Sequence, residues 1–117
     1  MTDTITLTIP KSSSYRSVAT LVLGGIGSRF DVPFERVDDL QLAVLSVLPA
    51  CREVVTIEVE AADDDAIGVT IGPLEGSPDD PGLRRVVDRL VDAVEASHRE
   101  GADWLSLRLR RARSEVV

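Results

Sequence analysis

Few side chains in this sequence are of the types that carry out catalysis. The 117-residue chain has one histidine, His98, and one cysteine, Cys51. Histidine is the commonest general acid or base, but the pattern around His98 predicts a place near the end of a helix, where the helix dipole favours a cation. Three serines at positions 12–14 lack the Gly-x-Ser-x-Gly sequence that presents a nucleophilic serine. A single thiol can form neither a disulfide within the chain nor a cysteine-based metal site, so we expect Cys51 to be a buried structural residue and assign no metal ligand.

The acidic residues are concentrated in one part of the chain. The net charge is -7, and the segment from Glu53 to Leu83 holds nine acidic residues and no Lys or Arg, giving -9. The remainder holds 13 basic and 11 acidic residues, giving +2. We expect the acidic segment to make one end of the molecule negative, which repels phosphates and nucleic acid and favours a basic protein partner.

Four arginines cluster near the C-terminus, at positions 108, 110, 111 and 113. Proteins that bind single-stranded nucleic acid combine such cations with aromatic side chains, and none is interleaved here. Alternation predicts that Arg108 and Arg110 lie on the solvent side of a strand. We therefore expect these arginines to pair with acidic groups of neighbouring strands or of a protein partner, and we expect no nucleic-acid binding.

Length and composition predict one domain over residues 1–117. Hydrophobic residues make up 44% of the chain and aromatic residues only 3%, so Val, Leu, Ile and Ala must fill the core. No apolar run reaches the length of a membrane span, and the first residues show neither a basic start nor an apolar signal segment. We expect a cytoplasmic protein that does not bind membranes.

The first half of the sequence predicts a strand followed by two helices. Threonine and aliphatic residues alternate over residues 4–9, with the period of a strand that has one buried face. The glycines within residues 24–27 lie inside a helical pattern, which indicates close helix packing or a helix end rather than a phosphate loop. A second helix is predicted over residues 37–51, and Pro49 should end or bend it about one turn early. The first helix should bury the stripe Tyr15, Val18, Ala19, Val22, Ile26 and Phe30.

The second half predicts a hairpin, a loop, a helix and a last strand. Alternation over 55–60 and 67–71 indicates two strands joined by an acidic turn, and residues 72–82 have the composition of a loop. Amphipathic spacing predicts a helix over residues 83–94, and alternating leucines predict a strand over 105–109. The expected fold is a two-layer α/β sandwich of order βααββαβ, with a four-stranded, mostly antiparallel sheet covered on one face by three helices.

Part of the second helix resembles a nucleotide-binding helix. The segment Asp39-Leu40-Gln41-Leu42-Ala43-Val44 is similar to the opening of "DLxLAVxEAxxNA" in the histidine-kinase-like ATPase superfamily, most closely in its anti-sigma factor serine-kinase branch. Residues 82–95 resemble the family's "GLxLVxxLVDxVE" helix, and residues 104–109 resemble its final strand. The resemblance extends over residues 5–111, and it implies a Bergerat-like fold and a degenerate member of this family.

The residues that carry the family's chemistry are replaced in this chain. Ser46 stands where the family has the Glu that activates the attacking hydroxyl or water, and Ala50 stands where it has the Asn that coordinates Mg²⁺. The resemblance therefore implies no catalytic residue.

The family's adenine-binding Asp-x-Gly-x-Gly box is also incomplete. Gly72 and Gly76 remain, but Glu75 could replace the missing Asp only if the loop shifted. Gly82 closes a lid segment that contributes three carboxylates and no cation. The degenerate nucleotide positions implied by the resemblance are thus Ser46, Ala50, Gly72, Glu75, Gly76 and Gly82, with no cofactor expected.

The resemblance implies an anti-sigma-type regulator that binds a sigma factor, an anti-anti-sigma factor or both, without ATP hydrolysis or phosphotransfer. Members of this branch are often homodimers. One alternative is an active serine kinase that uses ATP and Mg²⁺, with Glu53 or Glu75 as a substitute base. Another is a structural or interaction domain of a larger signalling assembly.

Overall fold

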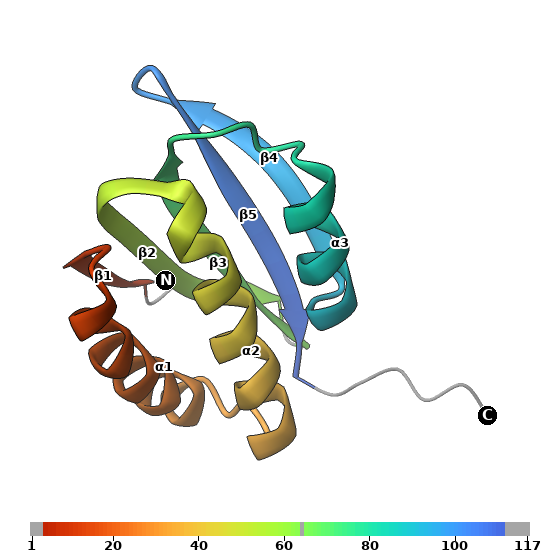
Figure 1. Ribbon diagram of the computed structural model, residues 1–117. Helices are drawn as coiled ribbons and strands as arrows, with labels where there is room; N and C mark the ends of the chain where they lie inside the picture. Colours follow the sequence, from red (N-terminus) through yellow and green to blue (C-terminus); the bar gives the residue numbers. More distant parts are fainter. Residues whose placement is uncertain (1–3, 64, 112–117) are drawn as a thin grey trace.

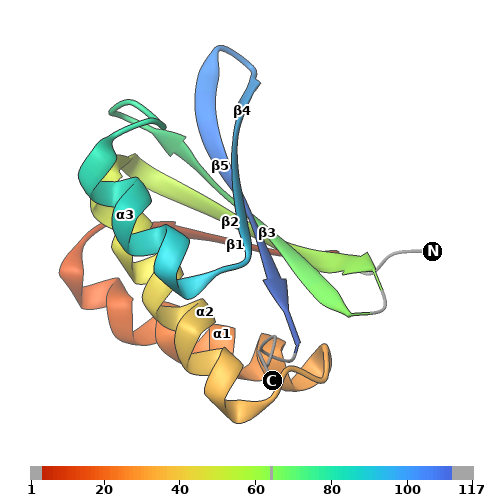
Figure 2. The ribbon, with the colours of Figure 1, turned by 90° about the vertical axis from the view of Figure 1, so that its right-hand side faces the viewer.

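Five strands form one antiparallel sheet, and three α-helices pack against one of its faces (Figures 1 and 2). The computed structural model describes residues 4–63 and 65–111. The sheet order is β1-β2-β3-β5-β4, and each pair of neighbours is antiparallel. The elements are β1 (Thr4–Pro10), α1 (Arg16–Arg29), α2 (Phe34–Val47), β2 (Cys51–Asp63), β3 (Ala66–Leu74), α3 (Pro81–Leu90), β4 (Ala93–Arg99) and β5 (Ala102–Arg110), with short 3₁₀ turns at Ser13–Tyr15 and Leu48–Ala50.

The predicted four-stranded sheet and the order βααββαβ are wrong in one respect. The helix expected over residues 83–94 ends at Leu90, and Ala93–Arg99 form β4 instead. A tight turn at Glu100 (φ 52°) and Gly101 (φ 76°) returns the chain antiparallel into β5. Pairing with β5 outweighs the helical periodicity of residues 91–94, because local propensity yields to tertiary context.

The core lies between the sheet and the helices and is aliphatic, as expected. The strand register places Leu7, Ile57, Ile71 and Leu105 in one row on the face that the helices cover. The helices bury a complementary set: Ala19, Leu23, Ile26, Leu40, Ala43, Val44, Val47 and Val87.

The predicted stripe of α1 was partly wrong. Ala19, Ile26 and Phe30 are buried, but Tyr15 and Val18 are exposed. Leu23, which was outside the predicted stripe, is fully buried. Residues 21–23 are all apolar, so spacing alone could not decide which of them faces the core.

Pro49 has the predicted effect on the second helix. The α-helix ends at Val47, the chain continues through the 3₁₀ turn Leu48–Ala50, and β2 begins at Cys51. Proline lacks the N–H that an α-helix needs at this position. None of the helices within the described residues is long and apolar enough to cross a membrane.

Gly27 permits the close contact of α1 with α2, which confirms the packing role expected for a glycine here. A Cβ atom at Gly27 would lie 2.7 Å from Cγ2 of Val37. Gly25, two residues earlier, faces open space. The two glycines on one helix therefore form a matched pair for mutation.

We predict opposite effects for Gly27→Ala and Gly25→Ala. Gly27→Ala should destabilise the protein by about 1–3 kcal/mol, because the new methyl group overlaps a short, stiff side chain. Gly25→Ala should stabilise it by up to about 1 kcal/mol, because alanine is the better helix former. Urea denaturation of both variants measures the difference, and equal effects would contradict the packing assignment.

Candidate functional site

Ser46 and Ala50 have structural contacts of their own. The Ser46 hydroxyl donates a hydrogen bond of 2.7 Å to the Leu42 carbonyl, one turn earlier on α2. The Ala50 carbonyl accepts a hydrogen bond of 2.8 Å from the Glu75 N–H. The structure thus brings Ala50 and Glu75 together through the main chain, while the Glu75 carboxylate is exposed.

Gly72 is explained by packing against a tryptophan. It lies in β3, and a Cβ atom there would approach Cδ2 of Trp104 within 2.7 Å. The Trp104 ring, on the neighbouring β5, is buried and lies 4.5 Å from the Arg99 guanidinium carbon. Arg99 also contacts both carboxylate oxygens of Glu58 at 3.3 Å. The smallness of Gly72 is therefore required by the sheet itself.

Asp80, the last residue of the loop before α3, caps the N-terminus of this helix. The Asp80 carboxylate accepts a hydrogen bond of 3.0 Å from the Leu83 N–H, so it occupies the N-terminus of α3. Asp79 makes an exposed ion pair of 3.4 Å with Arg84. Gly76 faces open space, and Gly82 lies in the first turn of α3.

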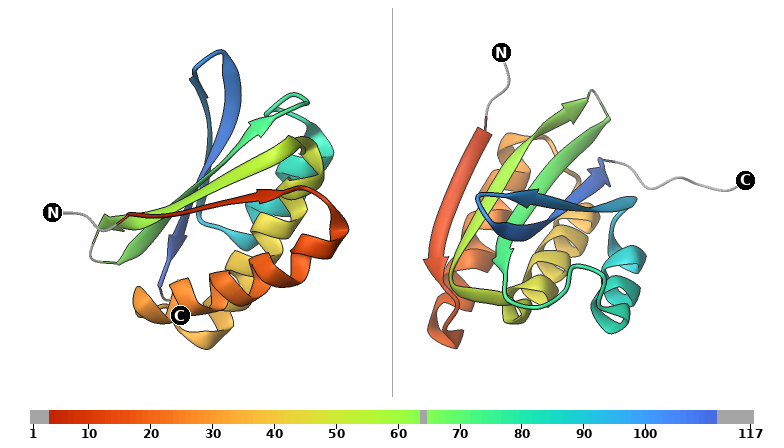
Figure 3. Two further views of the ribbon diagram at one scale, coloured as in Figure 1. Left: turned by 90° about the vertical axis from the view of Figure 1, so that its left-hand side faces the viewer. Right: turned by 90° about the horizontal axis from the view of Figure 1, so that it is seen from above.

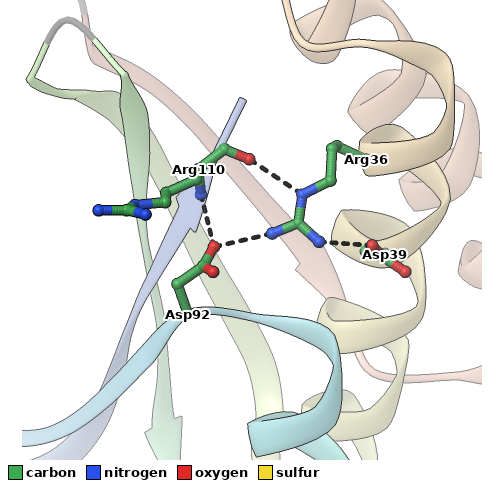
Figure 4. A network of polar contacts seen from close by, with 4 residues as sticks. All are labelled: Arg36, Asp39, Asp92 and Arg110. Atoms are coloured by element: carbon green, nitrogen blue, oxygen red, sulfur yellow. Dashed lines mark hydrogen bonds and ion pairs between the residues drawn. The ribbon is translucent and has the colours of Figure 1, made fainter. Parts of the chain in front are cut away.

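A buried guanidinium that the sequence did not reveal links three elements (Figure 4). Arg36, on α2, is 4% exposed. Its guanidinium donates to Asp39 at 2.6 Å, to Asp92 at 2.8 Å and to the Arg110 carbonyl at 2.9 Å. Asp92 also accepts the Arg110 N–H at 2.7 Å, so all three charged groups of this network, Arg36, Asp39 and Asp92, are hydrogen-bonded.

The Arg36 network joins α2 to the α3–β4 connection and to the end of β5. Only the Arg36–Asp39 pair was within reach of sequence analysis, because its spacing of three residues places both on one side of a helix. Asp92 lies 56 residues from Arg36 and Arg110 lies 74 residues away, and no local pattern marks them. The arrangement has the burial and the satisfied hydrogen bonds of a structural link.

Two residues considered for chemistry are accounted for by their surroundings. The prediction that His98 lies near the end of a helix is wrong. His98 lies on β4, where its exposed ring contacts Asp103 at 3.0 Å. Cys51 is fully buried, as predicted, and its Sγ lies 3.5 Å from the Val47 carbonyl. Burial raises the pKa of the Cys51 thiol to about 12, against a smaller lowering by Lys11, so the thiol is neutral near pH 7.

Three of the four C-terminal arginines lie within the described residues. Arg108 and Arg110 are exposed, as alternation predicted. Arg111 donates to the Phe30 carbonyl at 2.7 Å, which ties the end of β5 to the end of α1. Arg113 lies outside the described residues.

The acidic segment does not lie at one end of the molecule, which corrects the sequence-based expectation. The long strand β2 separates its two ends: Asp65 follows the far end of β2, whereas Glu75, Asp79 and Asp80 lie near its start. Glu58, between them, is paired with Arg99. The loop before α3 carries the exposed acidic residues Glu75, Asp79 and Asp80.

The outer side of the α1–α2 pair carries a groove and exposed apolar side chains. The groove has a volume of about 430 Å³. Leu21 on α1 is 78% exposed, and Phe34 and Leu42 on α2 are 81% and 52% exposed. Phe34, Asp38 and Leu42 are spaced four residues apart and form one row along α2. The residues that line the groove are Gly24, Ser28, Val32, Phe34, Val37, Asp38 and Gln41. We call Leu21, Phe34, Leu42 and this groove the α1–α2 face.

Comparison with known proteins adds no assignment. No family model matches the chain, and a search of curated proteins found no significant match.

Within residues 4–63 and 65–111, no three His, Cys, Asp or Glu side chains gather in a way that could hold a metal ion. The class defined by the structure is a two-layer α/β protein with a five-stranded antiparallel sheet.

We predict that Arg36→Met destabilises the protein by about 3 kcal/mol, because it removes the buried cation that binds both Asp39 and Asp92. Arg85→Met, on the exposed side of α3, is the control and should change the unfolding free energy by no more than about 0.5 kcal/mol. Chemical denaturation measures both. A loss below about 1 kcal/mol for Arg36→Met would show that the network does not stabilise the fold.

Proposed function

We propose that this chain is an anti-sigma-type regulatory module that binds a protein partner through the α1–α2 face and transfers no phosphoryl group. The observation that carries the proposal is the exposure of Leu21 on α1 and of Phe34 and Leu42 on α2, together with a groove that Phe34 and residues of both helices line. Large apolar side chains that cluster on a surface are characteristic of protein-binding sites. The resemblance of α2 to the anti-sigma branch supplies the partner class, a sigma factor or an anti-anti-sigma factor.

The chemistry of the α1–α2 face suggests what the partner presents. Phe34 has the size and exposure of an anchoring aromatic residue at an interface. Asp38 lies between Phe34 and Leu42 in the same row and is exposed. A partner with apolar side chains and one Lys or Arg opposite Asp38 complements this surface.

The positions expected for a nucleotide support a role without phosphoryl transfer. Ser46 is a weak base, and its proton is already donated to Leu42. Ala50 offers no side-chain oxygen to Mg²⁺. The N-terminus of α3 could otherwise attract a phosphate, but the Asp80 carboxylate occupies it.

The serine-kinase alternative requires a base other than Ser46. Glu53 and Glu75 are both exposed, and they lie on opposite sides of the β2–β3 pairing at Cys51 and Leu74. Nothing in their contacts favours either as a base. The alternative of a structural domain in a larger assembly shares the protein-binding role and differs from our proposal only in its partner.

We predict that the double variant Ser46→Glu, Ala50→Asn does not bind Mg-ATP. The family side chains would be restored, but Asp80 would still cap α3 and repel the phosphates. Thermal unfolding with and without Mg-ATP is the measurement for both the double variant and the unaltered protein. Ligand present at a hundred times its dissociation constant stabilises a protein by about 2.7 kcal/mol, which corresponds to a clear rise in Tm. Such a rise in the unaltered protein would favour the kinase alternative.

We predict that Leu21→Ala with Phe34→Ala weakens partner binding at least about tenfold, mainly through faster dissociation, because both side chains lose buried contact area. Surface-capture kinetics against purified sigma and anti-anti-sigma factors of the source genome measure the effect. Val54→Ala, which removes a 57% exposed valine from β2, is the matched control and should not change binding. Binding that ignores the α1–α2 double variant but depends on Val54 would move the site to the sheet, and no binding to either partner class would refute the proposed function.

A further inference from the structure

The α1–α2 face lies on two neighbouring helices. Residues 30–33 form the short connection between α1 and α2, so the two helices are antiparallel and lie side by side (Figure 3). Within residues 4–63 and 65–111, no other helix or strand lies over their outer side. Helices satisfy their own main chain, so this surface offers no strand edge with which an extended peptide could pair. A segment that docks here must likewise satisfy its own main-chain groups, as a helix does.

Gly24 leaves a hollow in the groove between the two helices. It lines the groove without a side chain, and Gln41 on the opposite helix donates a hydrogen bond of 2.8 Å from its Nε2 to the Thr20 carbonyl. A Cβ atom at Gly24 would lie 3.5 Å from this Nε2, which is an ordinary contact. The packing of α1 against α2 therefore does not require this glycine, in contrast to Gly27. The space above Gly24 can receive an apolar side chain of a partner.

The rim of the groove is acidic. Asp38 lines the groove, and Glu35 lies one turn earlier on α2. Both side chains are exposed, and neither forms a hydrogen bond or an ion pair with another residue in the part of the chain that the structure describes. None of the residues that line the groove is basic. Two unpaired carboxylates beside an apolar groove complement a cationic partner and repel phosphates.

We infer that the groove receives an amphipathic, cationic helix of the partner, with an apolar side chain in the hollow at Gly24 and Lys or Arg beside Asp38 and Glu35. Such a helix packs as a third helix about 8–10 Å from α1 and α2, and its apolar stripe covers Leu21 and Phe34. This is the helix-in-groove mode of peptide recognition. The inference rests on the proposed function for the site, and it adds the structure and charge of the segment that binds there.

Fluorescence anisotropy of three labelled synthetic peptides with the full chain tests the inference. Each peptide has about 18 residues, which is long enough to form a helix. The first has leucines at helical spacing and lysines elsewhere, the second has the same composition with leucine and lysine alternating, and the third has the first pattern with glutamate in place of lysine. The first should bind at least about tenfold more tightly than the other two. No binding of the first peptide, or equal binding of the first and second, overturns the inference.

Filling the groove locates the bound helix. Gly24→Leu should weaken binding of the leucine–lysine helix at least about tenfold, because the new side chain occupies the hollow. Ser28→Leu, on the same wall of the groove, is a second filling variant. Gly25→Leu is the control, because it adds the same side chain one position away in open space, and it should bind at least as well as the unaltered chain. Circular dichroism establishes that the variants are folded, and binding that neither filling variant weakens overturns the inference.

Neutralising the rim tests the charge of the partner. Glu35→Gln with Asp38→Asn should slow association with the leucine–lysine helix and reduce its dependence on salt. Asp88→Asn with Glu95→Gln removes the same charge from exposed positions on α3 and β4, and should leave both unchanged. Equal effects of the two double variants would show that only the net charge matters, and would overturn the placement of the cations beside the groove.

Failure of the proposed function gives a different result from failure of this inference. The purified sigma and anti-anti-sigma factors are tested with the same groove-filling variants. If neither factor binds but the leucine–lysine helix binds and is displaced by Gly24→Leu, the partner class is wrong and the helix site stands. If a factor binds through Leu21 and Phe34 and Gly24→Leu does not weaken it, the proposed function stands and the helix in the groove is wrong.

Discussion

The buried guanidinium of Arg36 is the interaction on which the arrangement of helices and sheet depends. It connects α2 with the α3–β4 connection and with the C-terminal end of β5. A buried cation is tolerated only when charges and hydrogen bonds compensate its lost hydration, and here Asp39, Asp92 and a carbonyl do so together. Because these groups come from distant parts of the chain, the network forms only when β4 and β5 are in their native register.

The two sides of α2 have different roles. The inner side of α2 carries Leu40, Val44 and the Arg36 network, whereas the outer side carries Phe34 and Leu42. Exposed aromatic surface does not help the monomer fold, so Phe34 is the residue whose exposure most needs a functional explanation. In our proposal α2 therefore supports the fold on one side and presents the partner-binding surface on the other, although it resembles a nucleotide-binding helix.

Much of the fold could be predicted from the sequence, because period-two alternation is unambiguous in β1, β2, β3 and β5. Strand β4 could not be predicted, because Val91 and Val94 continue the helical spacing of α3 and only contacts with β5 decide between helix and strand.

The candidate site could also be predicted only in part. Local sequence identified Ser46, Ala50 and Gly72, but the reason for Gly72 is the Trp104 ring, which lies 32 residues further along the chain. The α1–α2 face depends on how two helices are rotated, and residues that are apolar all around α1 do not fix that rotation.

The packing of Trp104 has an optical consequence. It is the only tryptophan in the chain, and its ring lies on the open face of the sheet against Gly72 and beside Arg99. Its fluorescence therefore reports on one place, the β3–β5 junction. Helices α1 and α2 cover the opposite face of the sheet (Figure 2). A partner bound to them should therefore leave the emission spectrum nearly unchanged, whereas loss of strand pairing should shift it toward the wavelengths of hydrated indole.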